Sequence, residues 1–186
     1  MTDFSSNDFQ QLLSRYETAQ REGSSCYMDS DDYIDLSDYY LDIDKPGQAL
    51  DVAEEGIRLH PDDDLLPAVR AGVLIYMKRF EEARAVVDEL DEDTNYDVMY
   101  LEAQLCYGMD GNPEEADSLF HDWLECVENE WRSAEEEEDA TAEEAETEIR
   151  SAYMHIIMSY VELGEVERDT FARSWVKRYL KRFRTM

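Results

Sequence analysis

The sequence predicts an all-α fold in which antiparallel helix pairs stack into an α-solenoid. Three observations lead to this class. Ala49, Ala83 and Ala116 recur at steps of 34 and then 33 residues, with apolar residues at matching positions around them. Only seven glycines and four prolines interrupt 186 residues, and no long run alternates apolar and polar residues as a half-buried strand does. A period of this length is typical of a helical hairpin that buries its apolar face by stacking on a copy of itself.

The first expected elements are a single helix and a helix pair. Apolar residues at helical spacing predict an N-terminal helix over residues 7–22, with Asn7 as its N-cap, that covers the end of the stack. The first repeat is expected over residues 30–62, and the turn around Pro46 separates its two helices. The first helix of this pair is expected to bury Tyr33, Leu36, Tyr40 and Ile43.

Two further pairs are expected over residues 64–95 and 97–134. Lys78-Arg79 joins the helices of the second repeat, and so short a connection forces antiparallel packing. The second helix of the third repeat opens at Asn112-Pro113, because Asn is a favoured N-cap, Pro fits the first helical position and Glu115 can answer the cap. Its apolar stripe continues well beyond the length of its predecessors, which predicts an extended helix.

The last part of the chain combines an acidic segment with a basic one. Residues 135–148 hold nine acids and no base, and we interpret them as the tip of a long helical hairpin in which Thr141 and Glu144 form a capping box. A flexible acidic loop is the alternative. Residues 149–186 are expected to form a divergent fourth repeat with a basic C-terminal helix, which completes a single domain over residues 1–186. The aromatic stripe of that helix is Phe171, Trp175, Tyr179 and Phe183.

The second helices carry a recurring pattern. Pro46, Phe80 and Pro113 each stand three residues before one of the recurring alanines, where a small side chain lets two helices approach closely. In this pattern the chain resembles the tetratricopeptide repeat (TPR) family, most clearly over residues 30–128. The resemblance implies a right-handed, TPR-like superhelix whose first helices line a concave groove. Matched by register, the groove residues are Ile34, Asp38, Leu41, Leu65, Ala68, Gly72, Ile75, Tyr76, Leu101, Leu105, Met109, Met154, Met158 and Val161.

This concave strip is apolar with few charges. It lacks the Lys, Arg and Asn that family members use to bind a C-terminal carboxylate, so that specificity is disfavoured. An apolar strip with methionines suits a peptide or an amphipathic helix. We therefore expect a non-catalytic adaptor or scaffold that binds another protein or peptide. In the alternative interpretation, the strip is core that the N-terminal or C-terminal helix of the same chain covers.

The charge of the chain is uneven. Residues 168–186 hold seven Lys or Arg against one acid, whereas the chain as a whole carries a formal charge of −30. An acidic body repels nucleic acid and anionic membranes, so neither is an expected partner. The alternative functions are binding of a basic partner through residues 135–148 and association with nucleic acid through the basic C-terminal helix. In the simpler interpretation, the acids are a solvated face and the cations pair with the protein's own acids.

The sequence gives no indication of catalysis, of a cofactor or of a metal site. His60, His121 and His155 lie in separate repeats, and no glycine-rich phosphate loop or nucleophile motif is present. Three cysteines without metal-type spacing indicate reduced thiols, and the apolar run over residues 71–77 is too short to span a bilayer. We expect a cytoplasmic protein, and its oligomeric state stays open.

Overall fold

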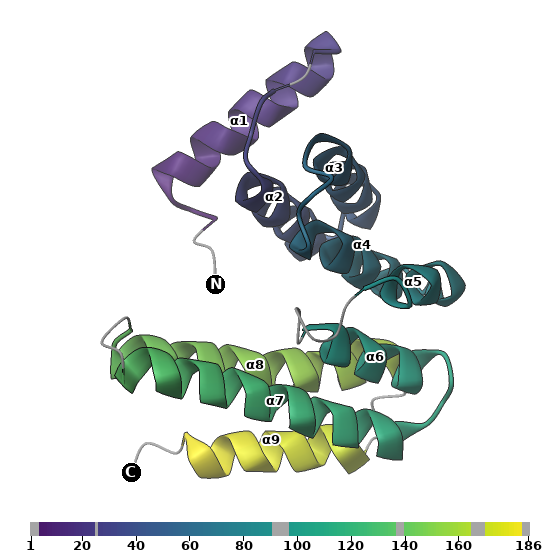
Figure 1. The fold of residues 1–186 in the computed structure, drawn as a ribbon, viewed down its shortest axis with the longest axis vertical. Helices are drawn as coiled ribbons and strands as arrows, with labels where there is room; N and C mark the ends of the chain where they lie inside the picture. The colour runs from purple at the N-terminus through teal and green to yellow at the C-terminus, as the bar shows by residue number, and fades with distance from the viewer. Residues whose placement is uncertain (1–3, 25, 91–96, 137–139, 165–169, 184–186) are drawn as a thin grey trace. The chain divides into compact units, whose positions relative to one another are not determined.

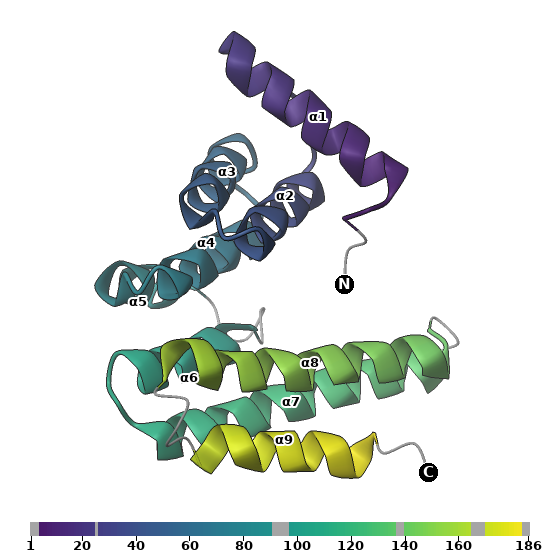
Figure 2. The ribbon, with the colours of Figure 1, turned by 180° about the vertical axis from the view of Figure 1, so that it is seen from behind.

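The computed structural model describes residues 4–24, 26–90, 97–136, 140–164 and 170–183. Within these ranges the chain forms nine α-helices and no strand, which confirms the all-α class (Figures 1 and 2). The chain divides into two compact units, Met1–Val86 (unit 1) and Val87–Met186 (unit 2). The assignment of all 186 residues to a single domain stays a prediction.

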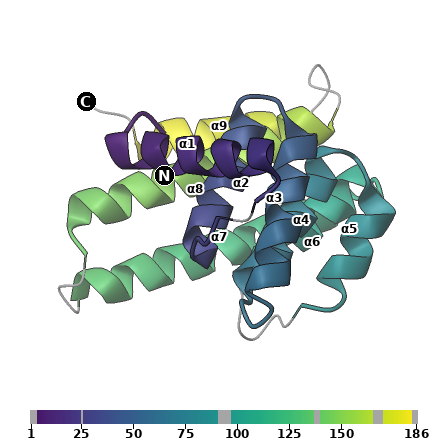
Figure 3. The same ribbon diagram turned by 90° about the horizontal axis from the view of Figure 1, so that it is seen from above.

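Unit 1 is built around three helices that contact one another. Its elements are α1 (Asn7–Glu22), α2 (Ser30–Asp42), α3 (Pro46–Leu59), α4 (Leu65–Tyr76) and most of α5 (Phe80–Val87). Helix α3 packs against both α2 and α4, and α2 also contacts α4 (Figure 3). Gly56 permits this approach, because a Cβ atom added to it would lie 3.0 Å from both Leu66 Cδ2 and Tyr33 Cβ.

Two local expectations in unit 1 were wrong. The N-cap of α1 is Ser6 rather than Asn7, since the Ser6 hydroxyl accepts a 3.2 Å hydrogen bond from the Phe9 N–H. Ile43 is not part of the buried face of α2. The helix ends one residue earlier at Asp42, and Ile43 is 37% exposed. The other three expected residues, Tyr33, Leu36 and Tyr40, are buried.

Unit 2 contains the two longest helices. Its elements are α6 (Asp97–Gly108), α7 (Pro113–Glu136), α8 (Ala142–Leu163) and α9 (Thr170–Arg182). Along the chain each of these helices packs against the next, and α6 also contacts α8. Gly164 follows α8 at a point where a Cβ atom would lie 2.1 Å from the Tyr107 hydroxyl oxygen. The fully buried side chains of the core include Phe120, Ile156, Tyr160 and Trp175.

The expected caps of α7 and α8 are present. The Asn112 side chain accepts from the Glu115 N–H at 3.4 Å, and its amide donates to the Glu115 carboxylate at 2.6 Å. Thr141 and Glu144 form the capping box. The described part of the acidic segment is therefore helical on both sides of its tip, as the hairpin interpretation expects, while residues 137–139 lie outside the described residues.

The three recurring alanines occupy equivalent positions. Ala49, Ala83 and Ala116 are each the fourth residue of a helix, in α3, α5 and α7, and each has 0% of its surface exposed. Of the expected repeats, residues 91–95 of the second and residues 165–169 and 184–186 of the fourth lie outside the described part of the chain. The shared helix position and the burial of these alanines agree with a structural unit that is repeated along the chain.

Candidate functional site

The strip expected from the sequence lies on α2 and α4 in unit 1 and on α6 and α8 in unit 2, except for Met109, which directly follows α6. Four of its side chains are buried and therefore have little surface to offer a partner: Ala68, Ile75, Leu101 and Leu105. Five of its residues are partly buried: Ile34, Leu41, Gly72, Tyr76 and Val161. Five are exposed: Asp38, Leu65, Met109, Met154 and Met158. The accessible apolar part is thus much smaller than the sequence suggested.

Two methionines form the main accessible apolar feature of α8. Met154 and Met158 lie one helical turn apart and are each 42% exposed. Next to them, a polar contact fixes α8 to α6. The Tyr100 hydroxyl lies 2.8 Å from Ser159 Oγ, and the Gln104 amide donates to the same oxygen at 3.0 Å. Ser159 is 2% exposed, and sequence analysis did not single it out.

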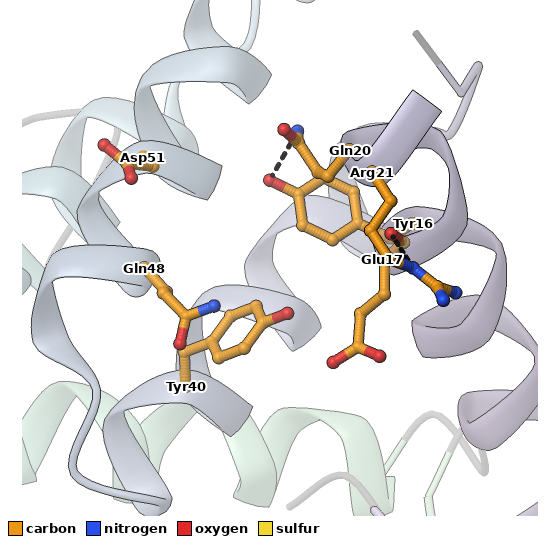
Figure 4. A pocket seen from close by; sticks show the side chains of 7 residues that line it. All are labelled: Tyr16, Glu17, Gln20, Arg21, Tyr40, Gln48 and Asp51. Atoms are coloured by element: carbon orange, nitrogen blue, oxygen red, sulfur yellow. Dashed lines mark hydrogen bonds between the residues drawn. The ribbon is translucent and has the colours of Figure 1, made fainter. Parts of the chain in front are cut away.

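A groove that the sequence did not predict lies in unit 1, between α1 on one side and α2 and α3 on the other (Figure 4). One cavity of about 310 Å³ is lined by Tyr16, Glu17, Gln20, Arg21, Tyr40, Gln48 and Asp51. An adjoining cavity of about 650 Å³ shares three of these residues and adds Gly23, Ser24, Glu54, Glu55 and Arg58. We call the two cavities together the α1–α3 groove. Its floor and its rim differ in character.

Two buried tyrosines form the floor of the groove. Tyr16 is 5% exposed and Tyr40 is 2% exposed. The Tyr16 hydroxyl donates to the Glu55 carboxylate at 3.4 Å, and the Gln20 amide donates to the Tyr16 oxygen at 3.1 Å and to Glu55 at 2.8 Å. These bonds fix α1 to α3. Burial, followed by the Glu55 charge, raises the pKa of Tyr16, and burial followed by the Glu17 charge raises that of Tyr40.

The rim of the groove has more acids than bases. Glu17 on α1 and Asp51 on α3 are exposed, lie on opposite walls and form no ion pair with any cation among the described residues (Figure 4). The rim cation Arg58 is already paired, with its Nη2 3.6 Å from Glu55 Oε1. The Arg21 guanidinium is hydrogen bonded to the Glu17 carbonyl and the Thr18 hydroxyl. The groove therefore offers free carboxylates to a positively charged ligand.

A second polar cavity lies in unit 2. It has a volume of about 430 Å³ and is lined by residues of α7, α8 and α9, among them His121, Glu125, Glu128, Arg132, Tyr153 and Arg182. Arg182 forms an ion pair with Glu128, and Arg178 is hydrogen bonded to the His121 ring. Burial, followed by the Arg178 charge, lowers the pKa of His121. In this cavity both Arg182 and Arg178 are therefore bound by side chains of α7.

The three histidines do not assemble into one site. His60 Nε2 donates to the Met28 carbonyl at 2.9 Å, His121 contacts Arg178, and His155 is exposed on α8. Among the described residues, no three His, Cys, Asp or Glu side chains lie together in a way that could hold a metal ion. Nor does any described helix combine the length and the apolar content that crossing a bilayer requires.

Comparisons with protein families, with curated proteins and with solved structures find no match. The functional argument therefore depends on the geometry and charge of the chain itself.

Proposed function

We propose that the chain is a non-catalytic adaptor that binds a basic, extended segment of a partner protein in the α1–α3 groove. The observation that carries this proposal is the opposed pair Glu17 and Asp51, two exposed carboxylates without a cationic partner among the described residues on the walls of a ready-formed cavity. Lys or Arg side chains of a partner would extend between the walls. Their aliphatic stems would lie against the exposed side chains of Gln20 on α1 and Gln48 on α3, which line the same cavity.

In this proposal, the adaptor is an α-solenoid of the tetratricopeptide kind that acts in the cytoplasm. The buried alanines Ala49, Ala83 and Ala116 support the repeated unit, and the contacts of α2 with α4 and of α6 with α8 support first helices that lie side by side. The N-terminal helix α1, expected only as a cover of the stack, then has a second role as one wall of the binding groove.

The experiment is a binding titration with fluorescently labelled oligolysine and oligoarginine peptides. The test variant Glu17→Gln/Asp51→Asn removes both free carboxylates, and the control Glu114→Gln/Glu130→Gln removes two exposed carboxylates of α7. Both variants change the net charge equally. We expect the groove variant to weaken binding about threefold or more and the control to leave it nearly unchanged. Equal affinities for the two variants would show attraction by net charge alone and would refute the groove.

The exposed methionines favour a second candidate surface, which belongs to the strip expected from the sequence. Met154 and Met158 would contact the apolar face of an amphipathic helix of the partner. Binding to this surface should persist at about 0.5 M salt, because screening to a few Å removes charge attraction but leaves apolar contacts. A partner that dissociates from the wild type at this salt concentration but is insensitive to Met154→Ser/Met158→Ser uses the groove instead.

A further inference from the structure

Helix α9 presents two faces of different character, and one of them is fixed to the protein. Trp175 is fully buried, and its indole Nε1 donates to Asp117 Oδ1 on α7 at 2.7 Å. On the same side, Arg178 is hydrogen bonded to His121 and Arg182 is paired with Glu128. These contacts set the rotation of α9 about its axis, so its opposite side must point away from α7 and α8.

The opposite side combines exposed apolar and cationic residues. Val176 is 39% exposed and Leu180, one turn later, is 56% exposed. Lys177 and Lys181 follow them directly, are exposed, and form no ion pair with any described residue. We call Val176, Lys177, Leu180 and Lys181 the α9 outer face. Its cations differ from Arg178 and Arg182, which the protein's own side chains bind.

We infer that the α9 outer face docks an acidic amphipathic helix of a partner protein. Two aliphatic side chains at a spacing of four residues form a short ridge of the kind that packs into the groove of another helix. The two lysines beside this ridge complement Glu or Asp side chains on the flank of the incoming helix. In a stack of helices, a face of this composition is where one more helix would add. This surface is separate from the α1–α3 groove and takes a ligand of the opposite charge.

The charge distribution of unit 2 argues for a helix rather than a membrane or a nucleic acid. The layer directly beneath α9 includes Glu125 and Glu128 on α7, which line a cavity together with Arg182 of α9. One helix diameter, about 10 Å, separates that layer from the outer face, which is close to the screening length of about 8 Å at physiological salt. An extended polyanion would approach these acids along its whole length. A single helix of about three turns contacts α9 alone.

The test uses two designed peptides. One is an amphipathic helix with leucines along one edge and glutamates on both flanks, and its twin has every glutamate replaced by lysine. We expect wild-type protein to bind the acidic peptide and not the twin, as measured by fluorescence anisotropy. Val176→Ser/Leu180→Ser and Lys177→Glu/Lys181→Glu should each weaken binding about tenfold or more. These residues are exposed, so circular dichroism should show unchanged folding.

Matched controls separate this surface from general charge effects. Lys45→Glu/Lys78→Glu changes the net charge by the same amount at exposed positions of unit 1 and should change affinity less than about twofold. Glu17→Gln/Asp51→Asn should have no effect on the acidic peptide. Absence of binding by wild type, or equal weakening by the α9 variants and the Lys45/Lys78 control, overturns the inference. Tighter binding to phosphatidylserine vesicles or duplex DNA than to the acidic peptide, abolished by Lys177→Glu/Lys181→Glu, also overturns it by identifying a polyanion site.

Discussion

The indole Nε1 of Trp175 donates a 2.7 Å hydrogen bond to the Asp117 carboxylate, 58 residues earlier in the chain. The same carboxylate oxygen lies 3.5 Å from the Tyr160 hydroxyl, and the His121 ring lies 4.5 Å from the indole, measured between ring centroids. The partly buried Asp117 side chain of α7 thereby joins three helices, because it contacts Tyr160 of α8 and Trp175 of α9. The orientation of the α9 outer face depends on this contact.

Replacing Trp175 should destabilise unit 2. Trp175→Phe removes the hydrogen bond to Asp117 and should cost about 1–3 kcal/mol, whereas Trp175→Ala also leaves a cavity and should cost about 3–5 kcal/mol. Urea denaturation followed by circular dichroism measures both. Val176→Ala, at the adjacent exposed position, is the control and should cost less than about 1 kcal/mol. Similar losses for Trp175→Ala and Val176→Ala would contradict the buried position of the indole.

Acidification should weaken unit 2 through His121. Burial and the neighbouring Arg178 lower the pKa of this histidine in the folded protein, while Asp117 and Asp122 oppose the shift. The unfolded chain, with a histidine pKa of about 6.5, therefore binds the proton first. Stability is fully present above this value and falls as the pH drops from about 7 towards the lowered pKa of the folded state.

The variant His121→Gln isolates this contribution from that of the many carboxylates. Over the interval from about pH 7 to pH 5, the free energy of unfolding of the wild type should decrease relative to that of the variant. Parallel curves for the two proteins would mean that His121 titrates alike in the folded and unfolded states.

Enlarging the recurring alanines should be costly at all three positions. Ala49→Leu, Ala83→Leu and Ala116→Leu each introduce a large side chain where no surface is exposed, and each should destabilise the fold by about 1–3 kcal/mol. Ala142→Leu, at an exposed position in the first turn of α8, is the matched control and should be nearly neutral. Destabilisation at only one of the three buried positions would contradict the equivalence of the helix pairs.

Salt should stabilise the protein. The formal charge of −30 creates self-repulsion in the folded state, and about 1 M salt reduces the screening length to about 3 Å. Thermal unfolding in increasing KCl should show a rising Tm. Surface ion pairs such as Arg79 with Glu82 weaken under the same conditions, but each contributes little. A Tm that falls with added KCl would show that the pairs outweigh the repulsion.

Features that depend on neighbours in sequence were predictable. The caps formed by Asn112 with Glu115 and by Thr141 with Glu144 span three residues, so their chemistry is visible in a short stretch of chain. The burial of the alanines followed from their recurrence. Even local inference has a limit, because Ser6 and Asn7 are both good N-caps and only the path of the backbone distinguishes them.

The candidate site was not predictable, because its contacts join distant residues. Tyr16 and Glu55 are 39 residues apart. In the sequence of α1 alone, Tyr16 belongs to an apolar stripe, which indicates a residue of the core. The exposure of residues in the expected concave strip also depends on distant parts of the chain. Register placed Leu105 and Met158 on one face, but their exposures of 0% and 42% depend on how neighbouring helices cover them. A repeat pattern predicts which residues share a face, but it does not predict how far each of them is buried.

The glycine after α8 has a consequence for how the sequence can vary. Any side chain at Gly164 would meet the Tyr107 hydroxyl oxygen, whereas a Cβ atom at Gly47 would have no neighbour within 4 Å. A Cβ atom at Gly164 would also lie 2.7 Å from the Tyr160 carbonyl oxygen, so in a randomised library selected for soluble expression position 164 should tolerate almost no replacement, whatever residue stands at position 107, while position 47 accepts many. Strict retention of glycine at position 164 would then record two steric contacts, one with a side chain of α6 and one with the backbone of α8.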